Sequence, residues 1–327
     1  MAPLKVGILG AARIADDGIV DPSRVLGHRL VAVAARDRSR AEAFAAQRGV
    51  EKAHHTYAEV IDDPEVEVVY NALVSSLHAQ WNQYALNAGK HVLSEKPFAR
   101  NAAEASLVRN VARTAPGQIV EGFHYLHHPV NQRLRELVTT GELGDIQQVD
   151  IELSIPAPPD SDPRWSLELA GGATMDLGCY VINAARQFGR WLGETPSVVS
   201  AEATLKKPDI DSAMRVELAY PGGVGGQLHW DMNANARQMV WTVTGTLATA
   251  VVPAFAVPHL DNRIVICRDG STGGQTLGDQ TSYTYQLAAL ADTLQTGAEF
   301  LIDVDDSVAN AELIDEVYRR AGLSPRG

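Results

Sequence analysis

Short apolar runs alternate with longer amphipathic segments through the first third of the chain. The apolar runs predict strands at residues 4–9, 30–35, 66–72, 91–94 and 118–122. The amphipathic segments predict helices at residues 40–48, 76–88 and 101–114. Gly49 and Gly89 follow two of these helical segments, as is common at helix C-termini. Repeated strand–helix units of this kind predict a parallel, doubly wound sheet.

The pattern changes after residue 124. A helix predicted at 129–140 is followed by a long alternating segment at 146–155. Further strands are predicted at 198–205, 214–220, 224–230, 239–244 and 263–267, and a last helix at 307–321. Turn signals such as Pro221-Gly222-Gly223 separate the strands. We therefore expect two domains, residues 1–124 and 125–327, the second an α/β domain with a mainly antiparallel sheet.

Composition narrows the class of protein. The 327 residues are 45% hydrophobic, enough for a large core, and the net charge of −12 argues against nucleic-acid or anionic-membrane partners. No apolar run approaches the roughly 20 residues that span a bilayer, and no signal peptide is visible. Cys179 and Cys267 give no disulfide framework, so we expect a cytoplasmic protein. We expect no metal site, because the adjacent pairs His54-His55 and His127-His128 are not chelating pairs on a strand.

The turn after the first strand is rich in glycine and alanine. Gly7, Gly10 and Ala12 form a relaxed version of the dinucleotide-binding fingerprint. Glycine allows a tight turn and lets backbone N–H groups approach a pyrophosphate at the N-terminus of the next helix. We therefore expect cofactor contacts along this turn, from Gly7, Gly10, Ala12, Arg13 and Ile14.

The end of the second predicted strand bears on the choice of dinucleotide. An acidic residue there would bind the ribose 2′-hydroxyl of NAD, whereas an arginine suits the 2′-phosphate of NADP. Arg36 occupies this position, and Ser39 and Arg40 open the following helix. Asp37 adjoins the same tip. The sequence thus favours NADP and leaves NAD possible.

The tripeptide Glu95-Lys96-Pro97 follows the buried strand predicted at 91–94. A lysine at the carboxyl end of such a strand lies where open α/β sheets bind ligands. The proline stops the strand and fixes the direction of the turn. An ammonium group in this place can hydrogen-bond a hydroxyl and favour its ionised form.

A third segment with candidate catalytic residues runs from Gly171 to Tyr180. If a helix begins near Gly172, Asp176 and Tyr180 are four residues apart and share one face. A tyrosine can donate or accept a proton when a nearby cation lowers its pKa, and an aspartate can hold a substrate hydroxyl beside it. The alternative is that Tyr180 is a core aromatic residue with a satisfied hydroxyl.

Together these segments resemble the Gfo/Idh/MocA family, named after glucose–fructose oxidoreductase and inositol dehydrogenase. Within it, residues 31–41 and Tyr180 are most similar to the dimeric dihydrodiol dehydrogenase and NADP-linked D-xylose dehydrogenase branch. Residues 121–129 also resemble sugar-nucleotide 3-ketoreductases. The resemblance implies an NADP-binding Rossmann domain at 1–124 and a substrate-binding and oligomerisation domain at 125–327. The second domain would contain a large open sheet through which subunits form a homodimer or homotetramer.

The resemblance also implies roles for single residues. Lys96 matches the active-site lysine, Tyr180 the acid/base and Asp176 the carboxylate that orients the substrate. Further implied cofactor contacts are Leu73, Ser75, His78, Glu95, Lys96, Pro97 and Trp165. His124 and Tyr125 are candidates for the substrate pocket. The chain departs from the family at Ser166, where an arginine is usual, and at Leu73-Val74-Ser75, where Thr-Pro-Asn is usual.

The expected function is that of an NADP(H)-dependent oxidoreductase, which interconverts a hydroxyl and a carbonyl on a sugar or related polyol. A trans-dihydrodiol dehydrogenase or a keto-sugar (sugar-nucleotide) reductase is the alternative among enzymes. A non-catalytic NAD(P)-binding regulator is the alternative of another class. The presence of Lys96, Asp176 and Tyr180 together speaks against the regulator, because a sensor has no chemical need for all three.

Overall fold

The computed structural model describes residues 2–327, which form two compact units. The first unit consists of the chain up to His124 together with Tyr283–Ala311, and the second of Tyr125–Ser282 together with Glu312–Gly327. The sequence placed residues 283–311 in the second domain. They belong to the first instead, because apolar side chains such as Leu287 and Leu290 pack into its core.

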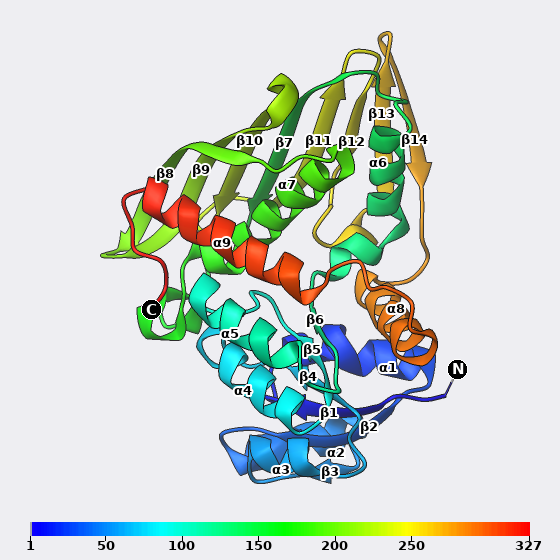
Figure 1. Ribbon diagram of the computed structural model, residues 1–327, viewed down its shortest axis with the longest axis vertical. Coiled ribbons are helices and arrows are strands. Elements are labelled where there is room, and N and C mark those ends of the chain that lie inside the picture. Colours follow the sequence, from blue (N-terminus) through cyan, green and yellow to red (C-terminus); the bar gives the residue numbers. More distant parts are fainter. Residues whose placement is uncertain (1) are drawn as a thin grey trace. The chain divides into compact units, whose positions relative to one another are not determined.

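The sheet of the first unit is parallel throughout, as predicted. Its strands are β1 (Lys5–Leu9), β2 (Arg29–Ala34), β3 (Lys52–Ala53), β4 (Val68–Asn71), β5 (His91–Ser94) and β6 (Ile119–Glu121). Their order is β3-β2-β1-β4-β5-β6, and every neighbouring pair is parallel (Figure 1). The strand order reverses between β1 and β4, and doubly wound sheets bind their ligands at the carboxyl ends of the strands beside such a reversal.

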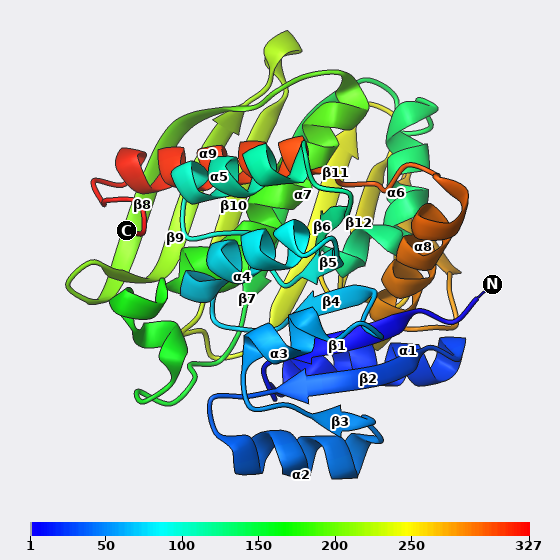
Figure 2. The same cartoon turned by 60° about the horizontal axis from the view of Figure 1, so that its bottom comes forward.

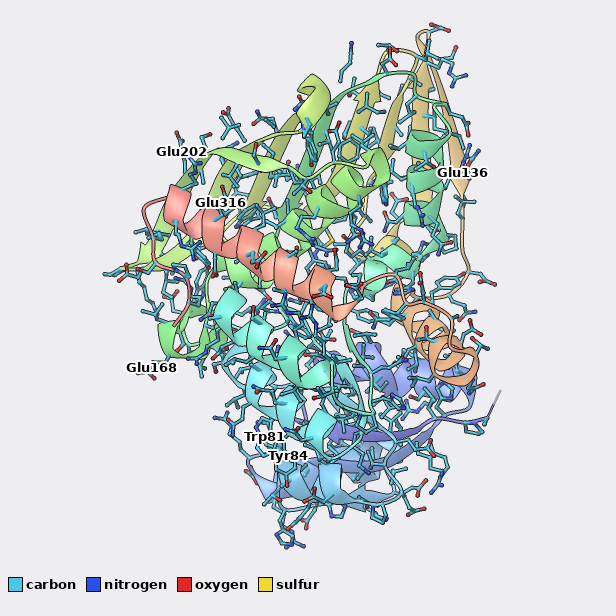
Figure 3. All side chains as sticks on the ribbon, viewed as in Figure 1. Trp81, Tyr84, Glu136, Glu168, Glu202 and Glu316 are labelled. Atoms are coloured by element: carbon cyan, nitrogen blue, oxygen red, sulfur yellow. The ribbon has the colours of Figure 1, made fainter. Side chains whose placement is uncertain are left out.

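Helices cover both faces of this sheet. They are α1 (Asp21–Leu26), α2 (Arg38–Arg48), α3 (Tyr57–Asp62), α4 (Ser75–Asn87), α5 (Ala102–Ala112), α8 (Ser282–Thr296) and the first part of α9 (Val304–Arg320). Figures 1 and 2 show α4 beside α5 in both views. Val6 and Ile8 of β1 join one apolar core, and Leu9 joins the other, because neighbouring strand residues point to opposite faces. Trp81 and Tyr84 of α4, labelled in Figure 3, have ring centroids 5.6 Å apart, and Trp81 also packs on Tyr57 of α3.

The second unit contains an eight-stranded sheet of order β14-β13-β12-β11-β7-β10-β9-β8. The strands are β7 (Ile146–Ser154), β8 (Ser197–Lys207), β9 (Ile210–Ala219), β10 (Gly225–Asp231), β11 (Gln238–Gly245), β12 (Thr249–Val252), β13 (Arg263–Arg268) and β14 (Ser271–Thr276). Only β7 and β10 pair in parallel, so the predicted mainly antiparallel sheet is confirmed. Helices α6 (Pro129–Thr139) and α7 (Cys179–Leu192) pack on one face (Figure 1).

Short helical turns connect the longer elements. They are η1 (Asp16–Val20), η2 (His124–His127), η3 (Pro163–Trp165), η4 (Leu167–Leu169), η5 (Thr174–Gly178), η6 (Pro221–Gly223) and η7 (Pro258–Leu260). Within residues 2–327, no helix has the length and apolar character that crossing a bilayer requires.

Gly7 lies inside β1 and does not form part of the turn after it. A Cβ atom at this position would lie 2.7 Å from Val60 Cγ1 and 2.9 Å from Val66 Cγ1. Real Cβ atoms do not approach carbon that closely, so the absence of a side chain lets α3 and the segment after it pack on β1. This packing explains why position 7 is a glycine, and its predicted contact with the cofactor stays a prediction.

We predict that Gly7→Ala lowers the free energy of unfolding by about 1–3 kcal/mol, because the added methyl group overpacks the contact with Val60 and Val66. Gly273→Ala is the matched control, since a Cβ atom there meets nothing within 4 Å. Urea unfolding of both variants without cofactor measures the difference. Equal midpoints for the two variants would refute the packing role of Gly7.

Candidate active site

The turn between β1 and η1 packs closely against neighbouring strand ends. Gly10 has a φ of +97°, and its N–H donates to Ala34 O at 2.8 Å. A Cβ atom at Gly10 would lie 3.2 Å from Ala72 O. Only glycine combines this φ with so close an approach. The following residues of the turn include the predicted contacts Ala12, Arg13 and Ile14.

The charged residues at the end of β2 differ in their contacts. Asp37 caps α2, and its Oδ1 accepts hydrogen bonds from Ser39 N at 2.8 Å and Ser39 Oγ at 2.7 Å. Arg40 donates to Ala11 O at 3.0 Å. Arg36 is exposed and makes no ion pair with any residue in the described part of the chain. Its guanidinium is therefore available to an anion, whereas Asp37 is held by the helix cap.

Glu95 and Lys96 leave the carboxyl end of β5 beside the ends of β4 and β6. Glu95 is buried, and its Oε1 accepts a hydrogen bond from the Tyr70 hydroxyl at 2.7 Å. Burial raises the pKa of Glu95, while the bond from Tyr70 and the charge of Lys96 act in the opposite direction. The lysine thus follows a carboxyl group that is fixed in the interior.

A buried polar network lies behind the Lys96 turn. Asn71 Nδ2 donates to Asn82 Oδ1 at 2.8 Å, and Asn82 Nδ2 donates to Ser94 Oγ at 2.9 Å. On the other side of the turn, Phe98 N donates to Glu121 Oε1 at 2.9 Å. Buried polar groups are costly to leave unpaired, so these bonds fix the backbone on both sides of Lys96. None of these hydrogen bonds was predicted from the sequence.

His78 links two turns at this edge of the sheet. Its Nδ1 lies 2.7 Å from Pro97 O, and its Nε2 lies 2.8 Å from Leu73 O. Burial lowers the pKa of His78. Because both ring nitrogens face protein carbonyls, His78 positions the Leu73 and Pro97 turns, and its predicted contact with the cofactor stays a prediction. Ser75 begins α4 directly after the Leu73 turn.

The second group of candidates lies in the second unit, between η3 and α7. From the sequence, Asp176 and Tyr180 share one face if a helix begins near Gly172. A helical segment does begin there, as the π-helical turn η5 at Thr174–Gly178, followed by α7 from Cys179. Asp176 thus lies in a π turn, and Tyr180 lies in α7. Single π turns within helices are frequent at functional sites.

Asp176 has a positively charged neighbour that the sequence reading did not find. Arg164 Nη1 lies 3.3 Å from Asp176 Oδ2. The same guanidinium binds Asp162 through Nε and Nη2, each at 3.0 Å. Hydrogen bonding to Asp162 raises the pKa of Arg164 above its usual value. Asp176 is therefore held by an arginine whose own orientation is fixed by a two-point contact.

Tyr180 packs beside Tyr125, with ring centroids 5.9 Å apart. Tyr125 is buried, and its hydroxyl donates to Asn183 Oδ1 at 2.7 Å. In the first unit, His124 is buried and stacks on Tyr283 at 3.7 Å. These contacts explain Tyr125 and His124 as packing residues, and their predicted contact with substrate stays a prediction.

Trp165 is likewise a packing residue. Its side chain is 2% exposed, and its Nε1 donates to Pro158 O at 3.3 Å. The structure thus accounts for Trp165 by burial, and its contact with the cofactor also stays a prediction. Among residues 2–327, no three His, Cys, Asp or Glu side chains are grouped so as to hold a metal ion.

A parallel sheet of this strand order, with a glycine turn after β1 and a buried network behind Lys96, defines a dinucleotide-binding unit. Comparison with known proteins agrees. Residues 4–123 match the oxidoreductase family with an NAD-binding Rossmann fold, and residues 131–251 match the Gfo/Idh/MocA C-terminal domain. The chain belongs to the Gfo/Idh/MocA family of oxidoreductases, as its resemblance predicted.

Relatives with known names extend over most of the chain. D-xylose 1-dehydrogenase (NADP(+)) 2 of Haloferax volcanii is 32% identical, with 96% of each chain covered. Trans-1,2-dihydrobenzene-1,2-diol dehydrogenase of Mus musculus is 34% identical over 78% of this chain and 76% of its own. The solved structure of KijD10, a 3-ketoreductase from Actinomadura kijaniata in complex with NADP and TDP-benzene, is 27% identical. It covers 98% of each chain with a TM-score of 0.88.

We predict that Asn82→Ala lowers the free energy of unfolding by about 1–3 kcal/mol, because it leaves Asn71 Nδ2 and Ser94 Oγ without this buried partner. Asn87→Ala, at an exposed position on the same helix, is the control. Thermal unfolding of the two variants measures the effect. The network would lose its assigned role if Asn82→Ala were as stable as Asn87→Ala.

Proposed function

We propose that this protein is an NADP(H)-dependent oxidoreductase that interconverts a hydroxyl and a carbonyl on a sugar or related polyol. The observation that carries the proposal is the Lys96 turn, held by buried hydrogen bonds at the carboxyl end of β5. The names of the relatives support the substrate class, since they include a D-xylose dehydrogenase and a 3-ketoreductase.

The residues at the strand ends fit a phosphorylated dinucleotide. The Gly10 turn has the close approach and positive φ that bring backbone N–H groups to a pyrophosphate. Arg36 supplies a free charge for the 2′-phosphate that distinguishes NADP from NAD. When bound, the nicotinamide supplies or accepts the hydride.

Side chains of this protein transfer the proton. In oxidation, the Lys96 ammonium stabilises the Tyr180 phenolate, which takes the proton of the reacting hydroxyl and becomes the phenol. Asp176, oriented by Arg164, accepts a hydrogen bond from a substrate hydroxyl and fixes the reacting carbon. In reduction, Tyr180 returns the proton to the carbonyl oxygen. The mechanism requires Lys96 and Tyr180 to act on one substrate oxygen.

Two other functions compete with this one. A trans-dihydrodiol dehydrogenase or a keto-sugar reductase would use the same chemistry on another substrate, and both have relatives of this chain as examples. A regulator would bind the dinucleotide without turnover. A screen of cofactor absorbance against aldoses, inositols, trans-dihydrodiols and keto sugars separates the enzymes by substrate. Tight cofactor binding with no turnover of any of them would favour the regulator.

We also propose a homodimer or homotetramer that associates through the eight-stranded sheet, and a cytoplasmic location. Alternate residues of the central strands, such as Asp150, Thr242 and His229, are only partly buried, whereas their neighbours in the strands are buried under helices. Cys179 and Cys267 are not joined in a disulfide, which agrees with a reducing compartment.

Lys96→Met and Tyr180→Phe should each slow the chemical step by orders of magnitude, on the order of 10²–10⁴-fold for a lost proton-transfer group. Cofactor affinity should stay nearly intact, because the Gly10 turn and Arg36 hold the dinucleotide. Single-turnover hydride transfer and cofactor titration measure the two effects separately. Rates within a few-fold of the parent would remove both residues from the mechanism.

Arg36→Ala should reduce the preference for NADPH over NADH. A charge-assisted contact with the 2′-phosphate is worth roughly 1.5–3 kcal/mol, or about 10- to 150-fold in affinity. Fluorescence titration of both reduced cofactors against the parent and the variant gives the four dissociation constants. If the parent binds NADH as well as NADPH, or if the variant keeps the full preference, Arg36 does not read the phosphate.

A further inference from the structure

A fully buried ion pair lies in the second unit. Arg326 Nη2 is 2.7 Å from Asp211 Oδ1, and the two side chains are 1% and 0% exposed. Asp211 lies at the start of β9, and Arg326 follows α9 near the end of the chain. The Arg326 guanidinium also lies over the ring of Tyr318, 4.3 Å from its centroid. The proposed mechanism makes no use of this pair.

Two hydrogen bonds connect the pair to the backbone around Gly172. Arg326 Nε donates to Gly171 O at 2.8 Å. Asp211 Oδ2 accepts a hydrogen bond from Thr174 N at 2.6 Å, and its Oδ1 accepts one from the Tyr318 hydroxyl at 3.2 Å. Gly171 and Thr174 flank the entrance to the π turn that contains Asp176.

The backbone at this entrance is shaped around the pair. Gly172 has a φ of +122°, and a Cβ atom there would lie 2.2 Å from Asp211 Oδ1 and 2.7 Å from Arg326 Nη2. Gly172 O accepts a hydrogen bond from Asp176 N at 3.1 Å, and Gly172 N donates to Arg164 O at 2.9 Å. The glycine in contact with the ion pair is thus bonded to both Asp176 and the arginine that orients it.

Stability alone is a weak explanation for such a pair. Taking two charges out of water is costly, and apolar replacements of similar volume are often neutral or stabilising. A buried pair does impose one geometry, because each charge must keep all of its partners. Here the partners include the backbone groups on either side of Gly172, so the pair constrains the turn that carries Asp176.

We propose that Arg326 and Asp211 are positioning residues for the reaction: they fix the entrance of the π turn and thereby the placement of Asp176. The proposal rests on the proposed function, in which Asp176 holds the substrate. Neither residue touches substrate or cofactor in this mechanism. Their loss displaces a carboxylate that must be held within a fraction of an ångström, and displacements of about 1 Å cost on the order of 10²-fold in rate.

The test compares Arg326→Met with two control variants. Arg320→Met removes an exposed arginine of α9 that lies 3.9 Å from Glu316, which Figure 3 labels. Ile264→Ala removes buried volume from β13 and so weakens the same unit elsewhere. Arg326→Lys keeps the charge beside Asp211 and serves if the methionine variant does not fold. All variants are compared at a temperature at which circular dichroism shows them folded.

Two measurements follow for each variant. Amide hydrogen exchange of residues 171–180 should rise at least tenfold in Arg326→Met and stay at the parent level in both controls. The kcat for the substrate found in the screen should fall about 10- to 100-fold in Arg326→Met, with the dissociation constant of NADPH within about twofold of the parent. Arg326→Lys should recover part of kcat.

The outcomes separate the two proposals. Unchanged exchange in residues 171–180 overturns the positioning role whatever the activity. Raised exchange with kcat within threefold of the parent overturns it too, because the turn would then move without consequence for the reaction. If kcat falls as much in Ile264→Ala as in Arg326→Met, lost stability of the unit explains the fall, and the positioning role is also overturned. A parent that turns over no substrate refutes the proposed function, while the exchange result still decides whether the pair fixes the turn.

Discussion

The parallel arrangement of β1, β2, β4 and β5 brings four strand ends to one edge of a sheet, and the dinucleotide site depends on that arrangement. Each of these ends continues into a turn, and hydrogen bonds connect these segments in pairs. Gly10 N–H bonds to the end of β2, and His78 joins the turn after β4 to the turn after β5. The backbone on both sides of Lys96 is thus held by hydrogen bonds within the first unit.

In the second unit, too, polar contacts hold the candidate residues. Polar contacts, partly exposed at Arg164 and fully buried at Asp211 and Arg326, constrain a short segment, and the candidate side chain extends from that segment. Arg164 orients Asp176 directly, and the buried pair of Asp211 and Arg326 fixes the backbone before it. Tyr180 lies one helical turn further, packed against Tyr125. In both units the residues expected to do chemistry are outnumbered by the residues that hold them.

The sequence predicts the elements that periodicity determines and misses those that contacts determine. Buried strands such as β5 and helices that end at a glycine, such as α2, were predicted within a few residues, because local pattern alone specifies them. Strand β14, Ser-Thr-Gly-Gly-Gln-Thr, has no apolar alternation and forms by pairing with β13. The assignment of α8 to the second domain failed because its partners in the core are far away in sequence.

The candidate site shows the same division. Lys96, Asp176 and Tyr180 were identified from motifs, whereas Arg164, Asn82 and the Asp211–Arg326 pair were not. Arg326 is 115 residues from Asp211, and no local signal connects them. Asn82 had a weak signal, since it shares the buried face of α4 with His78 one turn earlier. Two polar residues on an otherwise buried helix face indicate hydrogen-bonded partners behind it.

The central claim is that this chain transfers a hydride between NADPH and a substrate carbon, which bears a hydroxyl group in one state and is a carbonyl carbon in the other. The most direct measurement uses NADPH deuterated at the transferable position of the nicotinamide, with keto sugars and aldoses as acceptors and mass spectrometry of the products. The account predicts one deuterium on the carbon of the newly formed hydroxyl. Binding of the deuterated cofactor, seen as a change in its fluorescence, with no deuterium in any product would contradict it.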